Sequence, residues 1–492
     1  MDFLNTLKNE TNYGYTENGA VKHNSTLNAV YDMFALCGAY RTRSEADCIL
    51  MFKKALAEDE TLALKCLFYI GDCRGGQGER RFFRVCFHWL CNEYPEVARR
   101  NLEFIPTYRR WDDVLYSCDG TPVMEDALDF IKRQLVLDME CKTPSLLAKW
   151  LPSENASAAE TKRMGNIVRE HLGMTHKQYR KTLTYLRQLI NIVETLMSHN
   201  MWDKIEFDKI PSKAGLIYKN AFARRDIIAK KYEEFAKDKT TTVNAGTLYP
   251  YEIVEKAIRA HRTSLDDPTR LMVNKYWENQ KDYLNGEPCK MLCVCDTSGS
   301  MTWGSGAAVP INVAIGLSLY CAERVGEPFK DHYISFSSRP QLIETKGVDF
   351  VDKVERIYKT NLCENTDLVK TFDLLRDISL KVAPKDRLDT VVVISDMEID
   401  DATWRTGEFY DGESTATEME KVRKQWESYG LKMPRLIYWN VNARNDTILD
   451  FSPNVSFVSG CSPVIFEQIL SGKTGMDLML DKLLSDRYKD IH

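Results

Sequence analysis

The stretch MLCVCDTSGSM ends an apolar run with one carboxylate and two hydroxyl side chains. Asp296 follows the run directly, and Ser298 and Ser300 come next in a short polar turn. Two further oxygen side chains stand at comparable places: Thr366 in CENTDLV, at the start of a predicted helix, and Asp396 in VVVISDMEID, at the end of a second apolar run. Carboxylate and hydroxyl oxygens without a nearby His or Cys suit Mg²⁺ or a similar hard divalent ion better than zinc. These five residues therefore form a candidate metal site.

The composition of this site indicates binding of a partner and not catalysis. Only two of the five side chains are carboxylates, so they do no more than balance a divalent ion, which keeps a coordination position for water or for an acidic group of another molecule. A hydrolytic centre with two metals needs more carboxylates, and no His or nucleophile is placed to act as a base. Glu398 comes two residues after Asp396, and we interpret it as an exposed loop acid. We therefore expect no enzymatic activity.

Alternating strands and helices must position these oxygens. After Pro288 the pattern is typical of a Rossmann-like α/β domain, a parallel sheet with helices on both faces. The predicted strands are 290–296, 330–336, 389–396 and 434–441, and the predicted helices between them are 311–325, 367–382 and 415–430. Ligands of such a sheet bind beyond the carboxyl ends of its strands. Asp296 and Asp396 both stand at such ends, so we expect them to meet at one edge.

The chain before this domain reads as helices joined by short turns, from about residue 25 to residue 285. Helix pairs of this kind predict a stacked, repeat-like α domain. The segment YLNGEPCK is polar and contains Gly286 and Pro288. We therefore place the domain boundary there, with an α-helical domain over residues 1–287 and the α/β domain over residues 288–492.

Basic side chains gather on two predicted helices of the α domain. The first, residues 176–198, separates an apolar stripe from a basic face, and the second is YKNAFARRDIIAKKYEEF. The basic residues are Lys177, Arg180, Lys181 and Arg187 on the first helix, and Lys219, Arg224, Arg225, Lys230 and Lys231 on the second. Residues 151–239 hold 17 Lys and Arg against 11 Asp and Glu, so a polyanion such as RNA would dock here. A solvated surface without a ligand is the alternative interpretation.

The oxygen pattern resembles a known adhesion site. D-x-S-x-S after a first apolar strand, a Thr at the start of a later helix and an Asp ending a central strand look like the metal-ion-dependent adhesion site (MIDAS) of von Willebrand factor A domains. The resemblance covers roughly residues 288–492 and includes all five expected positions. It implies an A-type fold, a bound divalent ion, and a protein partner that offers Asp or Glu to that ion.

Two motifs in the N-terminal part, RGGQGERR (74–81) and RRWDDVL (109–115), resemble the TROVE module of Ro-type RNA-binding proteins. The segment LLAKWLPSENASA and the helices after it look closer to a related uncharacterised family. The resemblance implies a ring of HEAT-like helical repeats, bridged by the A domain, that binds single-stranded RNA ends in the ring and structured RNA on its outer surface. It adds Arg74, Arg80 and Arg81 as candidate RNA-binding residues.

Both motifs also have a structural interpretation. The glycines of RGGQGERR can form a turn between helices while its arginines pair with nearby acids, and this interpretation stays open beside phosphate contact. RRWDDVL is expected to bury Trp111 between helices, with Asp112 and Asp113 capping a helix or pairing with arginines.

The composition is that of an ordinary globular protein with more than one domain. The chain has 492 residues, 44% hydrophobic and 28% charged, with a net charge of −5. No apolar run is long enough for a membrane span, and the N-terminal residues do not read as a signal peptide. The cysteines are scattered without a C-x-x-C pair, which indicates reduced core residues and a cytoplasmic location.

Together these features favour a non-enzymatic RNA-binding scaffold in a ribonucleoprotein. Its α domain would contact RNA, and its α/β domain would hold Mg²⁺ and an acidic group of a protein partner. The alternative is a protein–protein adaptor or assembly factor that uses the metal site without nucleic acid. Residues 1–288 hold 42 Lys and Arg against 40 Asp and Glu, and this near neutrality weighs against a dedicated RNA binder.

Overall fold

The chain forms two compact units, described here from a computed structural model. The sheet unit comprises Met1–Cys66 and Ala245–Ser485, and the helical unit comprises Leu67–Asn244 and Asp486–His492. The structure describes residues 11–15, 21–284, 289–302, 308–336, 339–360, 367–397, 417–443, 446, 448, 454–470 and 472–492. The predicted boundary at 287/288 lies outside these residues. The compact units instead divide the chain after residues 66, 244 and 485. The reason is that helices which come before and after residues 67–244 in the sequence pack with the sheet.

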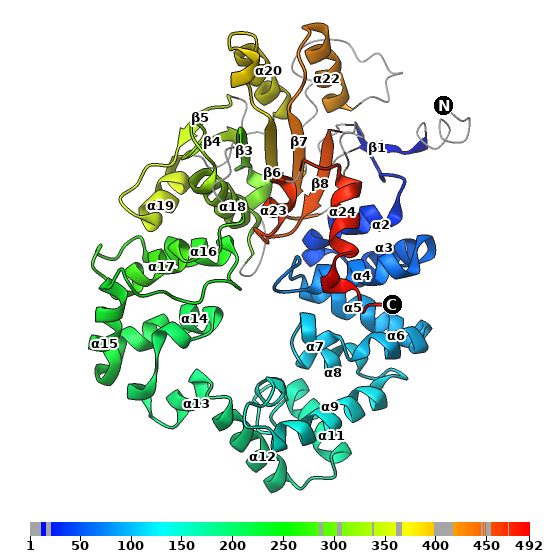
Figure 1. Ribbon diagram of the computed structural model, residues 1–492, viewed down its shortest axis with the longest axis vertical. Helices are drawn as coiled ribbons and strands as arrows, with labels where there is room; N and C mark the ends of the chain where they lie inside the picture. The colour runs from blue at the N-terminus through cyan, green and yellow to red at the C-terminus, as the bar shows by residue number, and fades with distance from the viewer. Residues whose placement is uncertain are drawn as a thin grey trace. The chain divides into compact units, whose positions relative to one another are not determined.

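The sheet unit is built on six strands in the order β5-β4-β3-β6-β7-β8 (Figure 1). The strands are β3 (Met291–Asp296), β4 (His332–Phe336), β5 (Leu342–Glu344), β6 (Thr390–Ser395), β7 (Arg435–Asn440) and β8 (Val455–Ser459). All neighbouring pairs are parallel except the edge pair β4 and β5. The predicted α/β sheet with mostly parallel strands is therefore confirmed, and its four predicted strands are present. The short strand β5 and the strand β8 were not predicted.

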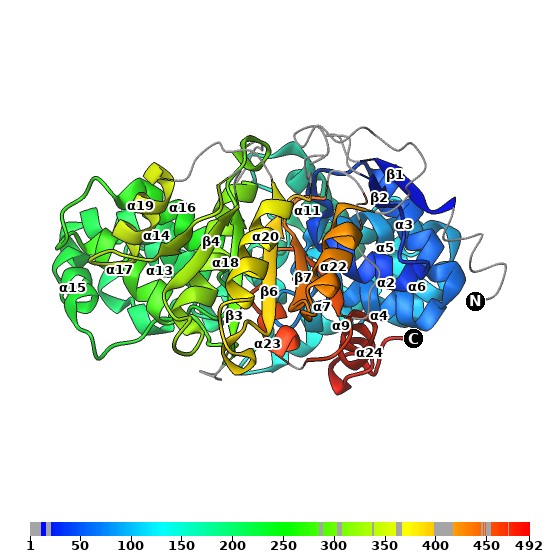
Figure 2. The same cartoon turned by 90° about the horizontal axis from the view of Figure 1, so that it is seen from above.

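The strands at the centre of the sheet are buried on both faces, which explains their unbroken apolar sequences. Every residue of β3 is buried, and so is every residue of β6 after Thr390. Such strands need helices on each side. The helix α18 (Pro310–Arg324) packs on β3, β4 and β6. The helices α20 (Leu368–Ser379) and α22 (Glu418–Ser428) lie side by side (Figure 2).

Helices from the predicted α domain complete the sheet unit. They are α2 (Ala29–Leu36), α3 (Glu45–Glu58), α16 (Pro250–Ala260) and α17 (Pro268–Glu278). The helix α2 packs on β8, and α16 packs on α18. A Cβ atom on Gly316 of α18 would lie 3.0 Å from the backbone of Pro250, so the close approach of α18 and α16 depends on this glycine. The helix α17 contacts α19 (Phe350–Thr360), where the rings of Trp277 and Phe350 stack 3.9 Å apart.

The helical unit consists of short helices joined by tight turns, in agreement with the predicted α-helical character. Its helices are the second half of α4 (Glu60–Gly71), then α5 (Arg80–Glu93), α6 (Pro95–Leu102), α7 (Ile105–Tyr108), α8 (Asp112–Cys118), α9 (Met124–Glu140), α10 (Leu147–Trp150), α11 (Ala159–His171), α12 (His176–Leu189), α13 (Val193–Ser198), α14 (Ser212–Arg224) and α15 (Asp226–Lys237). Three short 3₁₀ turns also belong to it: η2 (Trp202–Lys204), η3 (Phe207–Lys209) and η6 (Asp486–Tyr488).

The continuous helix predicted over residues 176–198 is wrong. The helix α12 begins at a capping box formed by Thr175 and Gln178, and it ends at Leu189. Asn191 has φ 52°, in the left-handed region that Asn tolerates better than most residues. The chain therefore turns there and resumes as α13 at Val193.

In the part of the chain that the structure describes, no helix combines the length and the apolar character that crossing a bilayer requires.

Candidate metal centre and nucleic-acid interface

The carboxyl ends of β3 and β6 lie side by side at the centre of the sheet (Figure 1). From β3 the chain passes through α18 to β4 on one side, whereas β6 is followed by α22 and then by β7 on the other. The strand order therefore reverses between β3 and β6, which is where open parallel sheets bind ligands. Asp296 is the last residue of β3, and Asp396 follows the last residue of β6. The structure thus brings both predicted carboxylates to this point.

Hydrogen bonds to both carboxylate oxygens fix the orientation of Asp296, whose side chain is fully buried. Oδ1 accepts the backbone N–H of Ser298 at 2.9 Å, and Oδ2 accepts the hydroxyl of Ser395 at 2.5 Å. The Oγ atom of Ser395 in turn accepts the N–H of Met397 at 3.0 Å. The Oγ atoms of Ser298 and Ser300 are 3.0 Å apart. Three predicted ligands therefore form one ordered cluster.

The backbone is strained beside the second carboxylate. Met397 has φ 63°, a left-handed conformation that a side chain of this kind rarely adopts. Such a conformation costs on the order of 1 kcal/mol or more, and it persists mostly where function fixes the local geometry. Asp396, directly before it, is 1% exposed. The turn after β6 therefore holds a buried carboxylate at an energetic cost.

This donor set fits a hard divalent cation. Asp296 and Asp396 are buried at the ends of two paired strands, and neighbouring carboxylates favour a positive charge between them. A cation held by these two carboxylates and by the hydroxyls of Ser298 and Ser300 would supply that charge with ligands of the kind Mg²⁺ prefers.

Thr366, the fifth predicted ligand, lies outside the described residues, and so does Glu398, which was interpreted as a loop acid. Across the described ranges, no group of three or more His, Cys, Asp or Glu side chains is placed to hold a metal. The candidate site at Asp296 and Asp396 has only two carboxylates beside its hydroxyls, so it does not belong to this class of cluster.

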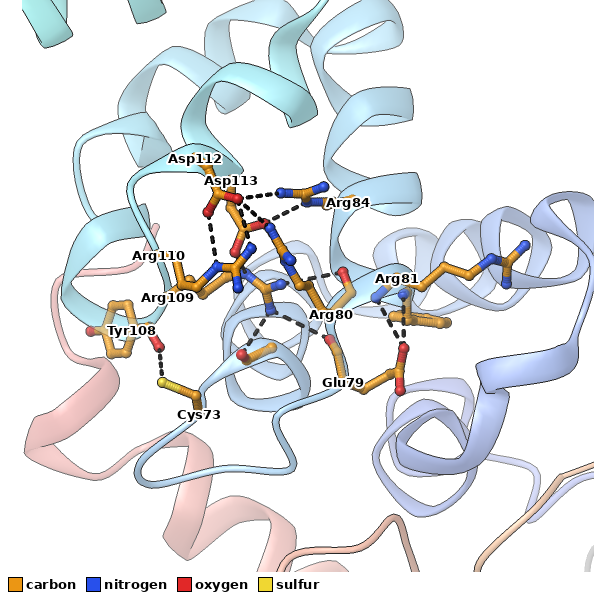
Figure 3. A network of polar contacts seen from close by, with 12 residues as sticks. Cys73, Glu79, Arg80, Arg81, Arg84, Tyr108, Arg109, Arg110, Asp112 and Asp113 are labelled. Atoms are coloured by element: carbon orange, nitrogen blue, oxygen red, sulfur yellow. Dashed lines mark hydrogen bonds and ion pairs between the residues drawn. The ribbon is translucent and has the colours of Figure 1, made fainter. Parts of the chain in front are cut away.

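In the helical unit, RGGQGERR and RRWDDVL meet in one ion-pair network (Figure 3). Four guanidinium groups surround two carboxylates. Asp113 accepts from Arg80 Nε (2.9 Å) and Arg84 Nε (2.5 Å) at Oδ1 and from Arg109 Nε (3.1 Å) at Oδ2. Asp112 accepts from Arg80 Nη2 (2.6 Å), Arg84 Nη2 (3.3 Å) and Arg110 Nη2 (2.7 Å) at Oδ2 and from Arg110 Nε (3.0 Å) at Oδ1. The predicted pairing of Asp112 and Asp113 with arginines is therefore confirmed.

The network gives Asp113 an unusually acidic carboxyl group. Burial alone would raise the pKa of this carboxyl, but Arg109, Arg84 and Arg80 lower it to about 2. Arg109 is buried too, and it also donates to the carbonyl of Gly71 at 2.7 Å. The network thus ties α5 and α8 to the end of α4. Arg80 was predicted to contact RNA, but its guanidinium is engaged in this network.

The glycine turn after α4 also has a structural role. A Cβ atom on Gly76 would lie 1.9 Å from the carbonyl oxygen of Tyr69, so no other residue fits without movement of the backbone. The fully buried carboxylate of Asp72 accepts the N–H groups of Arg74 at 2.9 Å and of Gly75 at 3.1 Å. Arg487, in the second segment of the helical unit, forms an ion pair with the same carboxylate.

The predicted RNA-binding residues fall into two groups. The first group is exposed, and within the described part of the chain no ion pair holds its members; it comprises Arg74, Lys177, Arg180, Lys181, Arg224 and Arg225. The second group consists of residues whose burial or contacts draw them into the fold, and it comprises Arg80, Arg81, Arg187 and Lys219. The first group presents its cationic groups to solvent.

Arg187 does not belong to the exposed basic face, which corrects the prediction. Its guanidinium donates to the carbonyls of Ala148 at 2.8 Å and Leu151 at 3.0 Å, and burial lowers its pKa. Lys219 is 7% exposed, because it lies on the inner side of α14. The predicted basic face of residues 176–198 places Arg187 outside, and Lys219 was predicted to contact RNA. Sequence periodicity does not show the chain segments that cover them.

Charge is divided between the two compact units. The helical unit has 31 Lys and Arg against 26 Asp and Glu, whereas the sheet unit has 35 against 45. The helical unit therefore carries an excess of five positive charges and the sheet unit an excess of ten negative charges. The near neutrality of residues 1–288 concealed this separation, because the acidic segments on either side of the helical unit belong to the sheet unit.

Two family models match different parts of the chain. Residues 290–486 match the model of a Domain of unknown function (DUF7788), and residues 16–117 and 144–286 match that of a Domain of unknown function (DUF2828). The chain is 26% identical over 511 residues to the uncharacterized protein L728 of Acanthamoeba polyphaga mimivirus, over 94% of this chain and 85% of that protein. A crystal structure of the Deinococcus radiodurans RO (RSR) protein is 13% identical, with a TM-score of 0.49, over 93% of this chain and 99% of that chain.

Sequence reasoning missed two residues that hold these sites together. Ser395 orients Asp296, and its signal was visible as a hydroxyl directly before Asp396 in VVVISD. Arg487 pairs with Asp72 across most of the chain, and no local pattern connects the two.

Proposed function

We propose that the chain is a non-enzymatic RNA-binding scaffold. The helical unit contacts the RNA backbone, and the sheet unit, with an A-type fold, holds Mg²⁺ or a similar ion at Asp296, Ser298, Ser300 and Asp396. The ion keeps a coordination position for an acidic group of a protein partner. The observation that carries the RNA proposal is the set of exposed cations without ion pairs in the described helical unit, together with the five excess positive charges of that unit.

Lys177, Arg180 and Lys181 support the proposal most directly. They follow one another on the exposed side of α12, while Tyr179 and Leu183 of the same helix are buried. A row of cations on one helix side neutralises neighbouring phosphates and releases their counterions. We therefore expect salt-dependent binding to single-stranded and hairpin RNA.

Charge reversal on α12 tests this function. We expect K177E/R180E/K181E to weaken binding of a fluorescent 20-nucleotide RNA at least tenfold in an anisotropy titration, and to reduce the slope of log K against log salt by about 2, since each phosphate contact contributes about 0.7. The matched control is K381E/K385E/K424E, which reverses three exposed lysines of the sheet unit. Equal affinities and slopes for the two triple variants would contradict RNA binding through α12.

Calorimetry tests the metal centre separately. Asp296→Asn keeps the shape of the side chain but removes half of the carboxylate charge in the candidate site. We therefore expect the wild type to take up Mg²⁺ and the variant not to. The control is Asp389→Asn, which changes an exposed carboxylate directly before the first residue of β6. Identical heats for the wild type and Asp296→Asn would remove the metal from the proposal.

A protein–protein adaptor is the second candidate function. The ten excess negative charges of the sheet unit suit a protein-facing surface better than a nucleic acid. Metal uptake without any RNA binding would favour this adaptor over the RNA scaffold.

A further inference from the structure

A groove of about 740 Å³ opens in the helical unit between α13, η2 and α14. Its lining includes Glu194, Trp202, Tyr218, Arg224 and Arg225. Two of these are among the exposed arginines predicted from the sequence, and the other three were not singled out. The volume lies in the range of sites for small organic ligands, which is roughly 300–1,000 Å³.

The lining of the groove includes a buried aromatic ring, that of Trp202. Trp202 is 4% exposed, and its ring packs edge-on against Phe222. The guanidinium carbon of Arg225 lies 5.0 Å from the centroid of the Trp202 ring. An arginine held over an aromatic ring is a flat cationic surface on which a nucleobase stacks.

Glu194 gives the groove a hydrogen-bond acceptor. The hydroxyl of Tyr218 donates to its Oε1 at 3.3 Å, and burial together with the charge of Glu194 raises the pKa of Tyr218, so the tyrosine stays a donor. The other oxygen, Oε2, is buried and accepts no hydrogen bond from the residues that the structure describes. A buried carboxylate oxygen without a donor is costly, and a ligand with N–H groups would relieve that cost.

We propose that this groove binds a guanine base of single-stranded RNA. Among the four RNA bases, only guanine presents two adjacent N–H donors, N1–H and the N2 amino group, on its Watson–Crick edge. A carboxylate accepts both, whereas the ring acceptor of adenine or cytosine and the carbonyls of uracil would face it with like charge. Arg225 stacks on the base, and Arg224 neutralises an adjoining phosphate.

The charges at the rim favour RNA over a cationic peptide. A lysine or arginine side chain of a partner protein would also satisfy Glu194. It would, however, approach between Arg224 and Arg225, both exposed and without an ion pair in the described part of the helical unit, and like charges at a binding surface disfavour such a partner. An RNA strand meets the same arginines with its phosphates.

This inference rests on the proposed RNA binding and deepens it, so its test compares two RNAs. The test is an anisotropy titration that compares the affinities of fluorescent UUUGUUUU and UUUAUUUU at one salt concentration. The wild type is expected to bind the guanine-containing RNA about tenfold more tightly, since a good paired contact to a base discriminates by about that factor or more. Glu194→Gln is expected to abolish the preference while it keeps affinity for UUUAUUUU.

Two further variants keep the test decisive. Glu234→Gln, on the exposed side of α15, is the matched control and should retain the preference. Arg225→Ala should weaken binding of both RNAs. If both RNAs bind equally to the wild type, or if the preference survives Glu194→Gln, the guanine groove is wrong while RNA binding stands. If neither RNA binds, the proposed function fails as well. If an Arg-rich peptide binds the wild type but not Glu194→Gln, the groove is a protein-docking site and the inference is overturned.

Discussion

The ion pair between Arg487 and Asp72 predicts how strongly the second segment of the helical unit stabilises the first. The carboxylate of Asp72 is fully buried, while the side chain of Arg487 is 35% exposed. Arg487 donates from Nε to Oδ2 and from Nη2 to Oδ1, the latter at 2.8 Å. The two partners therefore form a bidentate pair, which is the strongest kind of ion pair that an arginine makes.

The magnitude follows from what remains after Arg487→Ala. Breaking a buried pair typically costs about 3–5 kcal/mol, because a charge stays buried without compensation. Here Asp72 keeps the hydroxyl of Tyr488 at 2.9 Å and the N–H groups of Arg74 and Gly75, and solvent screens the exposed part of Arg487. We therefore expect a loss of about 2 kcal/mol from the free energy of unfolding of the helical unit.

Urea unfolding at pH 7 measures this loss, with hydrogen exchange to assign it to the helical unit. The amides of the turn between α4 and α5 should exchange faster in Arg487→Ala, whereas those of β3 and β6 should not change. The control is Lys489→Ala, an exposed cation two residues away, which should alter the free energy by less than about 0.5 kcal/mol. A loss below that limit for Arg487→Ala, or equal acceleration in both units, would refute the reasoning.

Two further predictions concern the same unit. The pKa of Asp113 is lowered to about 2, from an ordinary value of about 3.9. The ionised carboxyl group therefore stabilises the fold above pH 4, and this stabilisation is lost as the pH falls toward 2. The gap between the two pKa values corresponds to about 2 kcal/mol of folding free energy. Unfolding measured between pH 5 and pH 2 should therefore depend less on pH in Asp113→Asn than in the wild type, and parallel curves would contradict this. Gly76→Ala should cost more than about 3 kcal/mol in urea unfolding, because its Cβ meets the carbonyl of Tyr69, whereas Gly120→Ala, with open space around a φ of 71°, should cost only about 1 kcal/mol.

The sequence predicts the sheet better than the helices because burial leaves a local signal there. A strand covered on both faces must be apolar throughout, so MLCVCD and TVVVIS mark β3 and β6, and parallel pairing then brings Asp296 and Asp396 to one edge. Thr366 lies outside the described residues, so its place in the site stays a prediction.

Helical periodicity carries less information about the surface. It shows which residues of α12 face inward, but Arg187 is covered by carbonyls from about 40 positions earlier in the chain, and no pattern within the helix indicates them. The break at Asn191 depends on one left-handed residue. The groove at Glu194 and Trp202 is lined by α13 and η2, which follow that break in the chain. A prediction of one continuous helix over residues 176–198 therefore does not reveal the groove.

The division of the helical unit into two segments has a consequence for biosynthesis. Residues 67–244 leave the ribosome long before residues 486–492, because the whole of 245–485 is translated between them. During that interval Asp72 has no Arg487 to neutralise it, and the turn that it organises is less stable than in the finished chain. The helical unit therefore completes its fold only after the sheet unit has been made, and a nascent chain arrested between residues 244 and 486 would present the RNA-binding helices in a less stable form.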